Sequence, residues 1–244
     1  MKNNIFFLSG LPRTGATLLT SILDQNPNTH TEGNSALCQF MWDAQCSSRN
    51  IEQFYNRPDF SDKFLHKVPE IFYEGIDKNI LDKCRSWAIP ENIDMINNYI
   101  TKDFKMIIMT RPIIEIVKSF VHIRIQNGWE NPESGLLDKD SDPIMRSLNG
   151  VRYANSIDSG QFLFVSYDQL ITDTSKTIDK VYDFFGWEQF DHHFNNIVNN
   201  NPEPDFLINM SGLHTIRDTI GRREIDVQLS KELYEKAIGT SIFG

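Results

Sequence analysis

The sequence contains 244 residues, of which 40% are hydrophobic and 23% charged, and its formal net charge is -9. This length suits one globular domain with a sizeable core, and the composition excludes wholesale disorder and fibrous architectures. The negative charge argues against a general nucleic-acid-binding protein, so any anionic ligand must be held by a local cationic site.

Targeting and metal-binding signals are weak. The first apolar run, residues 5–8, is too short for a signal peptide or a membrane span, which predicts a cytoplasmic protein without membrane insertion. The cysteines Cys38, Cys46 and Cys84 show no Cys-x-x-Cys spacing and are expected to be free thiols. The adjacent pair His192-His193 points apart on a helix or strand, and we expect no metal site.

The N-terminal segment predicts a strand, a tight loop and a helix. Residues 5–9 are an apolar run that ends at Gly10, and helical spacing of apolar residues begins after Thr14. The turn formers Asn26-Pro27 should end this helix after about three turns.

The next segment, residues 36–75, carries aromatic residues at loosely helical spacing. Such a stripe is typical of helices that pack against a core, and an aromatic pocket for a substrate is the alternative.

Two further apolar runs predict buried strands, at residues 105–110 and 161–167. Each precedes a helical pattern, at 112–126 and 174–185. Repeated strand-helix units predict an α/β fold with three layers, α/β/α, around a mostly parallel central sheet.

The rest of the chain predicts long loops. Residues 128–143 are rich in acids and residues 199–212 in Asn and Pro. We therefore expect one domain over residues 1–244, with acceptor-side helices and loops at 31–78 and 128–160 and a C-terminal loop and helix at 199–244.

The loop after the first predicted strand has the Gly-x-x-x-x-Gly spacing of a phosphate-binding loop, from Gly10 to Gly15. Ala16 stands where a nucleotide triphosphatase needs Lys, and Arg13 supplies a cation earlier. Because guanidinium binds tetrahedral oxyanions in a forked geometry, a phosphosulfate fits this loop better than a nucleoside triphosphate. An ordinary strand-helix turn with a solvent-exposed Arg13 is the alternative.

This loop, Leu11-Pro-Arg-Thr-Gly-Ala-Thr-Leu-Leu19, resembles the Pro-Arg-Ser-Gly-Thr-Thr-Leu loop that binds 5'-phosphosulfate in sulfotransferases using 3'-phosphoadenosine-5'-phosphosulfate (PAPS). The sequence departs from it at Thr14 and at Ala16, which lacks a hydroxyl donor. The resemblance implies a donor-binding set of Pro12, Arg13, Thr14, Gly15, Ala16, Thr17 and Leu18.

Three more segments resemble the same family, in the family's order. Met109–His122 is similar to its 3'-phosphate element, which implies binding by Arg111 and Ser119, although the usual Arg-Asp-Pro is here Arg-Pro. Asn79–Trp87 resembles the Asp-Lys-x-x-x-Trp stretch, which implies Lys83 beside the transferred group. Val165–Leu170 resembles Tyr-Glu-x-Leu, which implies Tyr167 at the nucleotide.

The general base is less well marked. Glu32 lies near the position of the catalytic Glu in the protein-tyrosine branch, which implies a catalytic set of Glu32, Lys83 and Arg13. His30 and His66 are rival bases, and a surface loop acid is the alternative for Glu32. His122 is a weaker candidate. Three C-terminal arginines lie either over a 3'-phosphate or on a basic surface: Arg217, Arg222 and Arg223.

The resemblance covers residues 4–30, 79–126 and 160–187 and is closer to the protein-tyrosine and bacterial branch than to the cytosolic branch. It implies in-line transfer of a sulfuryl group from PAPS, without a metal, to a hydroxyl or amine acceptor that the sequence does not identify. A P-loop small-molecule kinase and a non-catalytic nucleotide-binding or interaction module are the alternatives.

Overall fold

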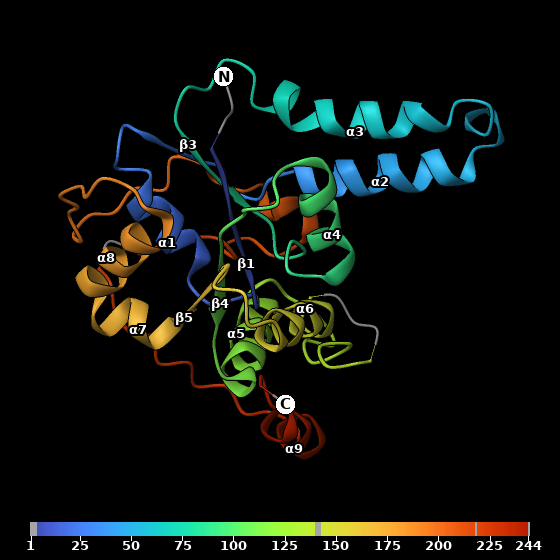
Figure 1. The fold of residues 1–244 in the computed structure, drawn as a ribbon. Coiled ribbons are helices and arrows are strands. Elements are labelled where there is room, and N and C mark those ends of the chain that lie inside the picture. The colour runs from blue at the N-terminus through green and yellow to red at the C-terminus, as the bar shows by residue number, and fades with distance from the viewer. Residues whose placement is uncertain (1–3, 140–142, 218, 244) are drawn as a thin grey trace.

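The protein is described by a computed structural model that covers residues 4–139, 143–217 and 219–243. Within these residues five strands form one parallel sheet of order β2-β3-β1-β4-β5 (Figure 1). The mostly parallel sheet and the three predicted strands are confirmed. Part of the predicted loop 128–143, residues 140–142, lies outside the described residues. The strands are β1 (Ile5–Gly10), β2 (Thr29–Thr31), β3 (Asn79–Lys83), β4 (Met106–Thr110) and β5 (Phe162–Ser166).

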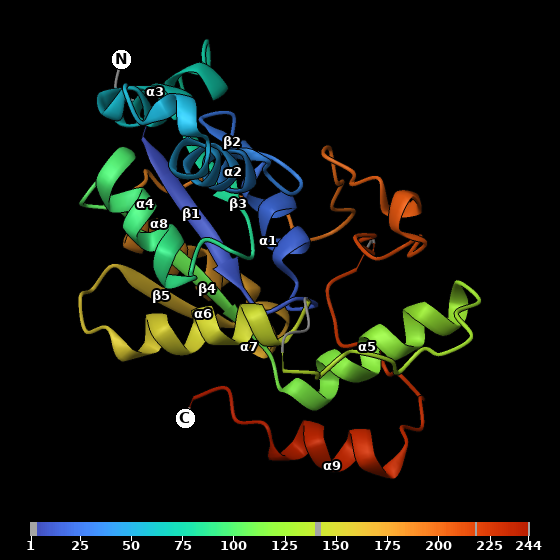
Figure 2. The same cartoon turned by 90° about the vertical axis from the view of Figure 1, so that its right-hand side faces the viewer.

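Helices cover both faces of the sheet, which gives the predicted three layers (Figures 1 and 2). One face packs against α1 (Ala16–Leu23), α7 (Tyr167–Thr172) and α8 (Thr174–Phe185). The other hydrophobic cluster draws on α2 (Leu37–Asn50), α3 (Pro58–Phe72), α4 (Pro90–Tyr99), α5 (Ile113–Gln126), α6 (Met145–Ser156) and α9 (Lys231–Gly239). Two short 3-10 helices complete the assignment, η1 (Glu52–Phe54) and η2 (Asp205–Ile208).

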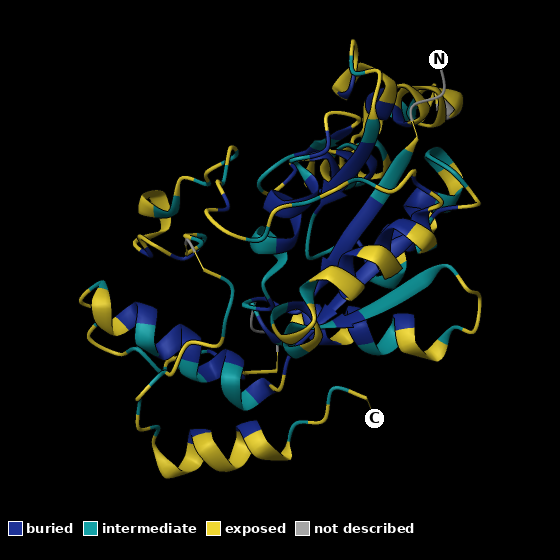
Figure 3. Ribbon diagram, turned by 90° about the vertical axis from the view of Figure 1, so that its left-hand side faces the viewer, coloured by how far each residue is buried: buried dark blue, intermediate teal, exposed yellow. Residues whose placement is uncertain are grey.

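The central strands are apolar on both sides because both sides are covered. Phe7 and Ile108 belong to the cluster formed with α2 to α6, whereas Leu8 and Ile107 face the cluster formed with α1 and α8. Successive strand residues point to opposite faces, so a strand between two helical layers is apolar at consecutive positions. Figure 3 shows the result: β4 is buried throughout, β1 is buried over its last four residues, and the edge strand β5 is mostly half-buried.

Two details differ from the sequence prediction. The first helix, α1, has eight residues instead of three turns. It ends early because the backbone tightens after Leu23 and the Asn26 side chain accepts a hydrogen bond from the Asn28 amide, which turns the chain into β2. The strands β2 and β3 were not predicted as strands, because Thr-His-Thr and the pair Asp82-Lys83 interrupt any apolar run.

The close approach of β1 and β4 requires glycine at position 10. Gly10 has a φ of 123°, and an added Cβ would lie 2.3 Å from the Met109 carbonyl oxygen. We expect Gly10→Ala to lower the free energy of unfolding by about 3 kcal/mol, from backbone strain and overpacking together. Gly75→Ala, at a positive φ in open space, should cost only about 1 kcal/mol. Urea denaturation measures both values, and equal losses would contradict the steric explanation.

Candidate active site

All five strands are parallel, so their carboxyl ends meet at one edge of the sheet, where ligands of open α/β sheets bind. A cavity of about 740 Å³ lies at this edge. Its lining contains Lys83 from the end of β3, Arg111 from the end of β4, Ser119 from α5 and Tyr167 from the start of α7. The predicted donor-binding set from the loop after β1 also lines it: Pro12, Arg13, Thr14, Gly15, Ala16, Thr17 and Leu18.

The loop between β1 and α1 leaves several amides open toward the cavity. Gly15 adopts a left-handed conformation with a φ of 80°, and the first helical bond runs from the Leu19 amide to the Gly15 carbonyl. The amides of Ala16, Thr17 and Leu18 therefore precede the hydrogen-bond ladder of α1 and have no acceptor within the helix. An anion at this helix start can accept bonds from them.

Arg13 joins the loop to two distant segments. Its Nε donates to the Ser119 hydroxyl at 2.9 Å, and its Nη1 donates to the Leu213 carbonyl. Burial and the neighbouring guanidinium of Arg111 lower the pKa of Arg13 to about 10, so it remains charged at neutral pH. The guanidinium is thus a fixed cation in the cavity.

Arg111 is held on three sides. Its Nη1 donates to the Arg13 carbonyl at 2.8 Å, its Nε pairs with Glu115 at 3.0 Å, and its guanidinium stacks 4.1 Å from the centre of the Tyr167 ring. Arg222 pairs with the same Glu115 at 3.1 Å. These contacts orient the Arg111 guanidinium before any anion binds.

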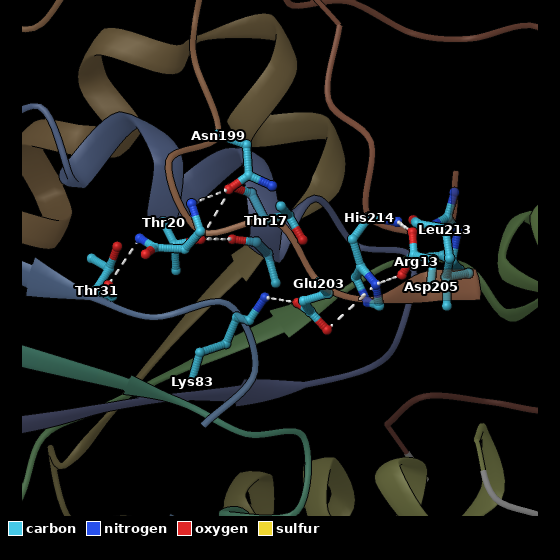
Figure 4. Close-up of polar contacts among 12 residues, drawn as sticks. Arg13, Thr17, Thr20, Thr31, Lys83, Asn199, Glu203, Asp205, Leu213 and His214 are labelled. Carbon is cyan, nitrogen blue, oxygen red and sulfur yellow. Dashed lines mark hydrogen bonds and ion pairs between the residues drawn. The ribbon is translucent and has the colours of Figure 1, made fainter. Parts of the chain in front are cut away.

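Lys83 lies deep in the cavity and pairs with a residue from the far end of the chain (Figure 4). Its Nζ is 2.7 Å from the Glu203 Oε1, and the two side chains are only 9% and 13% exposed. Burial lowers the pKa of Lys83, while the charge and hydrogen bond of Glu203 oppose that shift. Glu203 is therefore the group that contributes most to keeping Lys83 in its charged form.

An acidic pair that no sequence motif predicted, Glu203 and Asp205, lies in the cavity with its partner His214. The His214 Nδ1 lies 3.4 Å from the Glu203 Oε2 and also binds the Asp205 carboxylate, so the three side chains form one cluster over Lys83 (Figure 4). The only signal was the Asn- and Pro-rich composition of this stretch, which predicts a loop but no partner. Figure 2 shows the stretch beside α1 before the chain continues past α5 to α9.

The proposed bases occupy different surroundings from the predicted cations. Glu32 follows β2 and lies 3.5 Å from the His30 Nε2, and neither residue is part of the cavity lining. His66 lies on α3, where its Nδ1 is 2.7 Å from the Asp62 carbonyl oxygen, also outside the lining. His122 does line the cavity and contacts Arg223. The structure thus groups the cations but not the predicted base.

The cavity is cationic although the chain is acidic. Among the described residues that line it, two are carboxylates, Glu203 and Asp205, and seven are Lys or Arg: Arg13, Lys83, Arg85, Arg111, Arg124, Arg217 and Arg223. This excess provides the local site that an anionic ligand requires in a protein of net charge -9.

The described residues contain neither a candidate metal centre nor a candidate membrane span. They contain no cluster of three or more His, Cys, Asp or Glu placed to hold a metal ion. None of the helices in this part of the chain is both long and apolar enough to span a bilayer. The three cysteines are free thiols, as the sequence predicted.

Comparison with known proteins identifies one family. A family model described as "Sulfotransferase family" matches residues 6–192, and no curated protein sequence matches the chain. Solved structures with a similar fold include the sulfotransferase domain from the curacin biosynthetic pathway, at 17% identity and a TM-score of 0.58 over 97% of this chain and 96% of that one.

Two further solved structures are similar. The sulfotransferase domain from the Synechococcus PCC 7002 olefin synthase has 18% identity and a TM-score of 0.55 over 97% and 94% of the two chains. The sulfotransferase from Alicyclobacillus acidocaldarius has 15% identity and a TM-score of 0.50 over 84% and 88%. At these identities the likeness is one of fold.

Proposed function

The chain belongs to the sulfotransferase family, as its motifs predicted, and from this premise we propose that it takes the sulfuryl group from PAPS and transfers it to a hydroxyl or amine. The observation that supports this donor most directly is the convergence of Arg13, Lys83 and Arg111 from three neighbouring strand ends on one cavity. A donor with a phosphosulfate at one end and a 3'-phosphate at the other matches this set of cations.

The donor would be bound in two parts. The open amides of Ala16, Thr17 and Leu18, with Arg13, would hold the 5'-phosphosulfate, and Arg111 with Ser119 would hold the 3'-phosphate. Tyr167, fixed by its stacking on Arg111, would lie at the nucleotide. The direct bond from Arg13 to Ser119 supports this arrangement, because it brings the two phosphate-binding elements into contact.

Transfer would proceed by in-line displacement. The acceptor oxygen or nitrogen attacks sulfur, the bond from sulfur to the 5'-phosphate oxygen breaks, and the acceptor proton passes to a base. Arg13 and Lys83 would stabilise the charge that develops on the sulfuryl and phosphate oxygens. Glu32 is the base that the family resemblance implies, and Glu203, which pairs with Lys83, is a carboxylate within the cavity lining.

The alternatives are not favoured. A kinase needs a cation at position 16 to reach the β- and γ-phosphates, and this chain has Ala16 there. A non-catalytic module does not account for a buried Lys83 paired within the same cavity as Arg13.

Isothermal titration with adenosine 3',5'-bisphosphate and with ATP, in the absence of magnesium, tests the donor site. We expect the bisphosphate to bind the wild-type protein more tightly than ATP. Arg111→Ala should weaken bisphosphate binding by about tenfold to a hundredfold, since it removes charged hydrogen bonds worth about 1.5–3 kcal/mol.

Arg152→Ala is the matched control, because Arg152 lies outside the cavity and donates to the Ser241 carbonyl. It should leave bisphosphate binding unchanged. A preference for ATP, or equal losses in the two variants, would contradict the proposed donor.

A further inference from the structure

One buried charge lies directly behind the proposed site. Asp82 precedes Lys83 on β3, is 0% exposed, and points to the opposite face of the sheet from its neighbour. Its Oδ2 accepts hydrogen bonds from the Ser35 hydroxyl at 2.8 Å and the Tyr73 hydroxyl at 2.6 Å, and its Oδ1 accepts one from the Trp87 Nε1 at 2.7 Å. All three donors are neutral side chains.

Keeping an ionised carboxylate in this position costs stability. Burial raises the pKa of Asp82 to about 6, although the three hydrogen bonds work in the opposite direction. A raised acid pKa means that the folded protein holds its proton more tightly than the unfolded chain, so Asp82 contributes less stability as the pH rises from about 4 to about 6. The three hydrogen bonds reduce the cost of the buried charge but do not remove it, so stability alone does not explain why the protein keeps an acid at this position.

The donors come from three separate segments. Tyr73 directly follows α3, Trp87 lies in the turn after β3, and Ser35 belongs to the loop of residues 32–36 between β2 and α2. Ser35 is also bonded to the end of β3 itself, because its amide donates to the Lys83 carbonyl at 2.8 Å. Asp82 thus fixes this loop to the strand end that carries Lys83.

The loop of residues 32–36 leads back to the cavity. Asn34 lines the cavity, and Gly33 packs so closely on the C-terminal stretch that an added Cβ would lie 2.9 Å from both the Asn201 carbonyl oxygen and the Glu203 Cγ. Glu203 in turn holds the Lys83 ammonium. A continuous set of contacts therefore runs from Asp82 through Ser35, Gly33 and Glu203 to Lys83.

We propose that Asp82 is a positioning residue whose ionised carboxylate holds the loop of residues 32–36 on the end of β3, and so sets where Asn34 and Glu203 lie relative to Lys83. The inference rests on the proposed function for its catalytic consequence, but the placement of the loop can be measured without turnover.

Protonation should release part of this attachment. The titratable groups that face Asp82 are Tyr73, Glu32 on the loop, and the thiols of Cys38 on α2 and Cys84 after β3. A protonated Asp82 has one oxygen that carries hydrogen and accepts poorly, and its O–H can only be satisfied if the Ser35 or Tyr73 hydroxyl turns from donor to acceptor. At least one of the three hydrogen bonds to Asp82 must therefore weaken or reverse. Lowering the pH should therefore loosen the loop of residues 32–36, even though protonation of Asp82 itself adds to the stability of the folded protein.

Hydrogen exchange of the peptide containing residues 31–37 tests the placement, with Asp82→Asn and Tyr73→Phe as variants. At about pH 7.5 we expect exchange in Asp82→Asn to be at least about tenfold faster than in the wild type, with β4 unchanged. Lowering the pH to about 5 should speed the wild-type peptide, after correction for intrinsic rates, and leave the Asp82→Asn peptide unaffected. Tyr73→Phe, which removes one donor, should show a smaller increase.

The catalytic consequence is measured as release of adenosine 3',5'-bisphosphate from PAPS, with water as the acceptor. Asp82→Asn should lower this rate by about tenfold to a hundredfold, as expected for a misplaced catalytic group, and leave bisphosphate affinity within about twofold of the wild type. We expect the wild-type rate to fall in acid as Asp82 becomes protonated, and this acid limb should be absent from the pH profile of Asp82→Asn. Tyr182→Phe is the control, because Tyr182 is equally buried in the opposite cluster, where it accepts a hydrogen bond from Asn26.

Wild-type exchange in residues 31–37 for both variants, at both pH values, would overturn the inference. So would a variant with a lower melting temperature but the rate and pH profile of the wild type, since Asp82 would then act only on stability. If Asp82→Asn does not fold, Tyr73→Phe and Ser35→Ala decide the question by the same readouts. Failure of the wild type to bind the bisphosphate would contradict the donor site alone and leave the exchange result valid.

Discussion

Replacing Arg13 with alanine is expected to slow sulfuryl transfer by about a hundredfold to a thousandfold, the usual effect of removing one fixed donor from developing negative charge. Of the two proposed catalytic cations, Arg13 is the one in the loop after β1, and it donates a hydrogen bond to Ser119, which we propose to bind the 3'-phosphate. Its removal should therefore also weaken binding of the bisphosphate. Steady-state kinetics with PAPS, together with bisphosphate titration, measures both effects.

Stability separates this role from a structural one. Burial and Arg111 already lower the pKa of Arg13, which means that the folded protein holds this charge at a cost. Arg13→Ala should therefore change the melting temperature by no more than a few degrees while activity is lost. Arg13→Lys keeps a point charge without the forked geometry and should recover part of the rate. A variant that loses rate only in proportion to lost folded protein would contradict the catalytic role.

The parts of the fold that the sequence predicted are those determined by local pattern. The runs that became β1, β4 and β5 are apolar at consecutive positions because helices cover both faces, and each is followed by a helical pattern. By contrast, β3 carries two buried polar residues. Asp82 accepts three hydrogen bonds, and Lys83 forms an ion pair with Glu203. Such burial depends on tertiary partners, so hydrophobicity along the chain could not reveal this strand.

The same distinction applies to the site. The positions around Arg13 and Arg111 follow from spacing within a strand-loop-helix unit, and the structure places both in one cavity. The Lys83 to Glu203 pair joins residues 120 positions apart, and the Arg13 to Leu213 bond joins residues 200 apart. No local pattern encodes a contact of that separation, which is why residues 199–212 were predicted as a loop without partners, although Arg217 and Arg223, two of the three C-terminal arginines considered for a 3'-phosphate, do line the cavity. The assignment of Glu32 as the base stays a prediction.

Replacing Lys83 with alanine is the second change with a large expected effect. We expect the rate to fall by about a hundredfold to a thousandfold, because in the proposed mechanism Lys83 would supply charge at the transferred group. Bisphosphate affinity should change much less, since the product lacks that group. The variant also leaves Glu203 buried without its cation, so a loss of about 3–5 kcal/mol in the free energy of unfolding accompanies it. Equal losses of rate and bisphosphate affinity would contradict this role.

Glu203→Gln changes the charge of Lys83 while the lysine stays in place, and the position of the alkaline limb, not the size of the rate, reports that change because Glu203 is also a candidate base. Burial lowers the pKa of Lys83 and Glu203 opposes that shift, so removing the carboxylate must lower the pKa of Lys83 further. Because the proposed mechanism needs the ammonium form, activity is lost as the pH rises through the pKa of Lys83, and this alkaline limb should move to lower pH in the variant. The rate measured from about pH 7 to about pH 10 tests this directly. An unmoved limb would show that another group limits the reaction in alkali, whereas a limb shifted to lower pH would link the C-terminal carboxylate to the charge on which sulfuryl transfer depends.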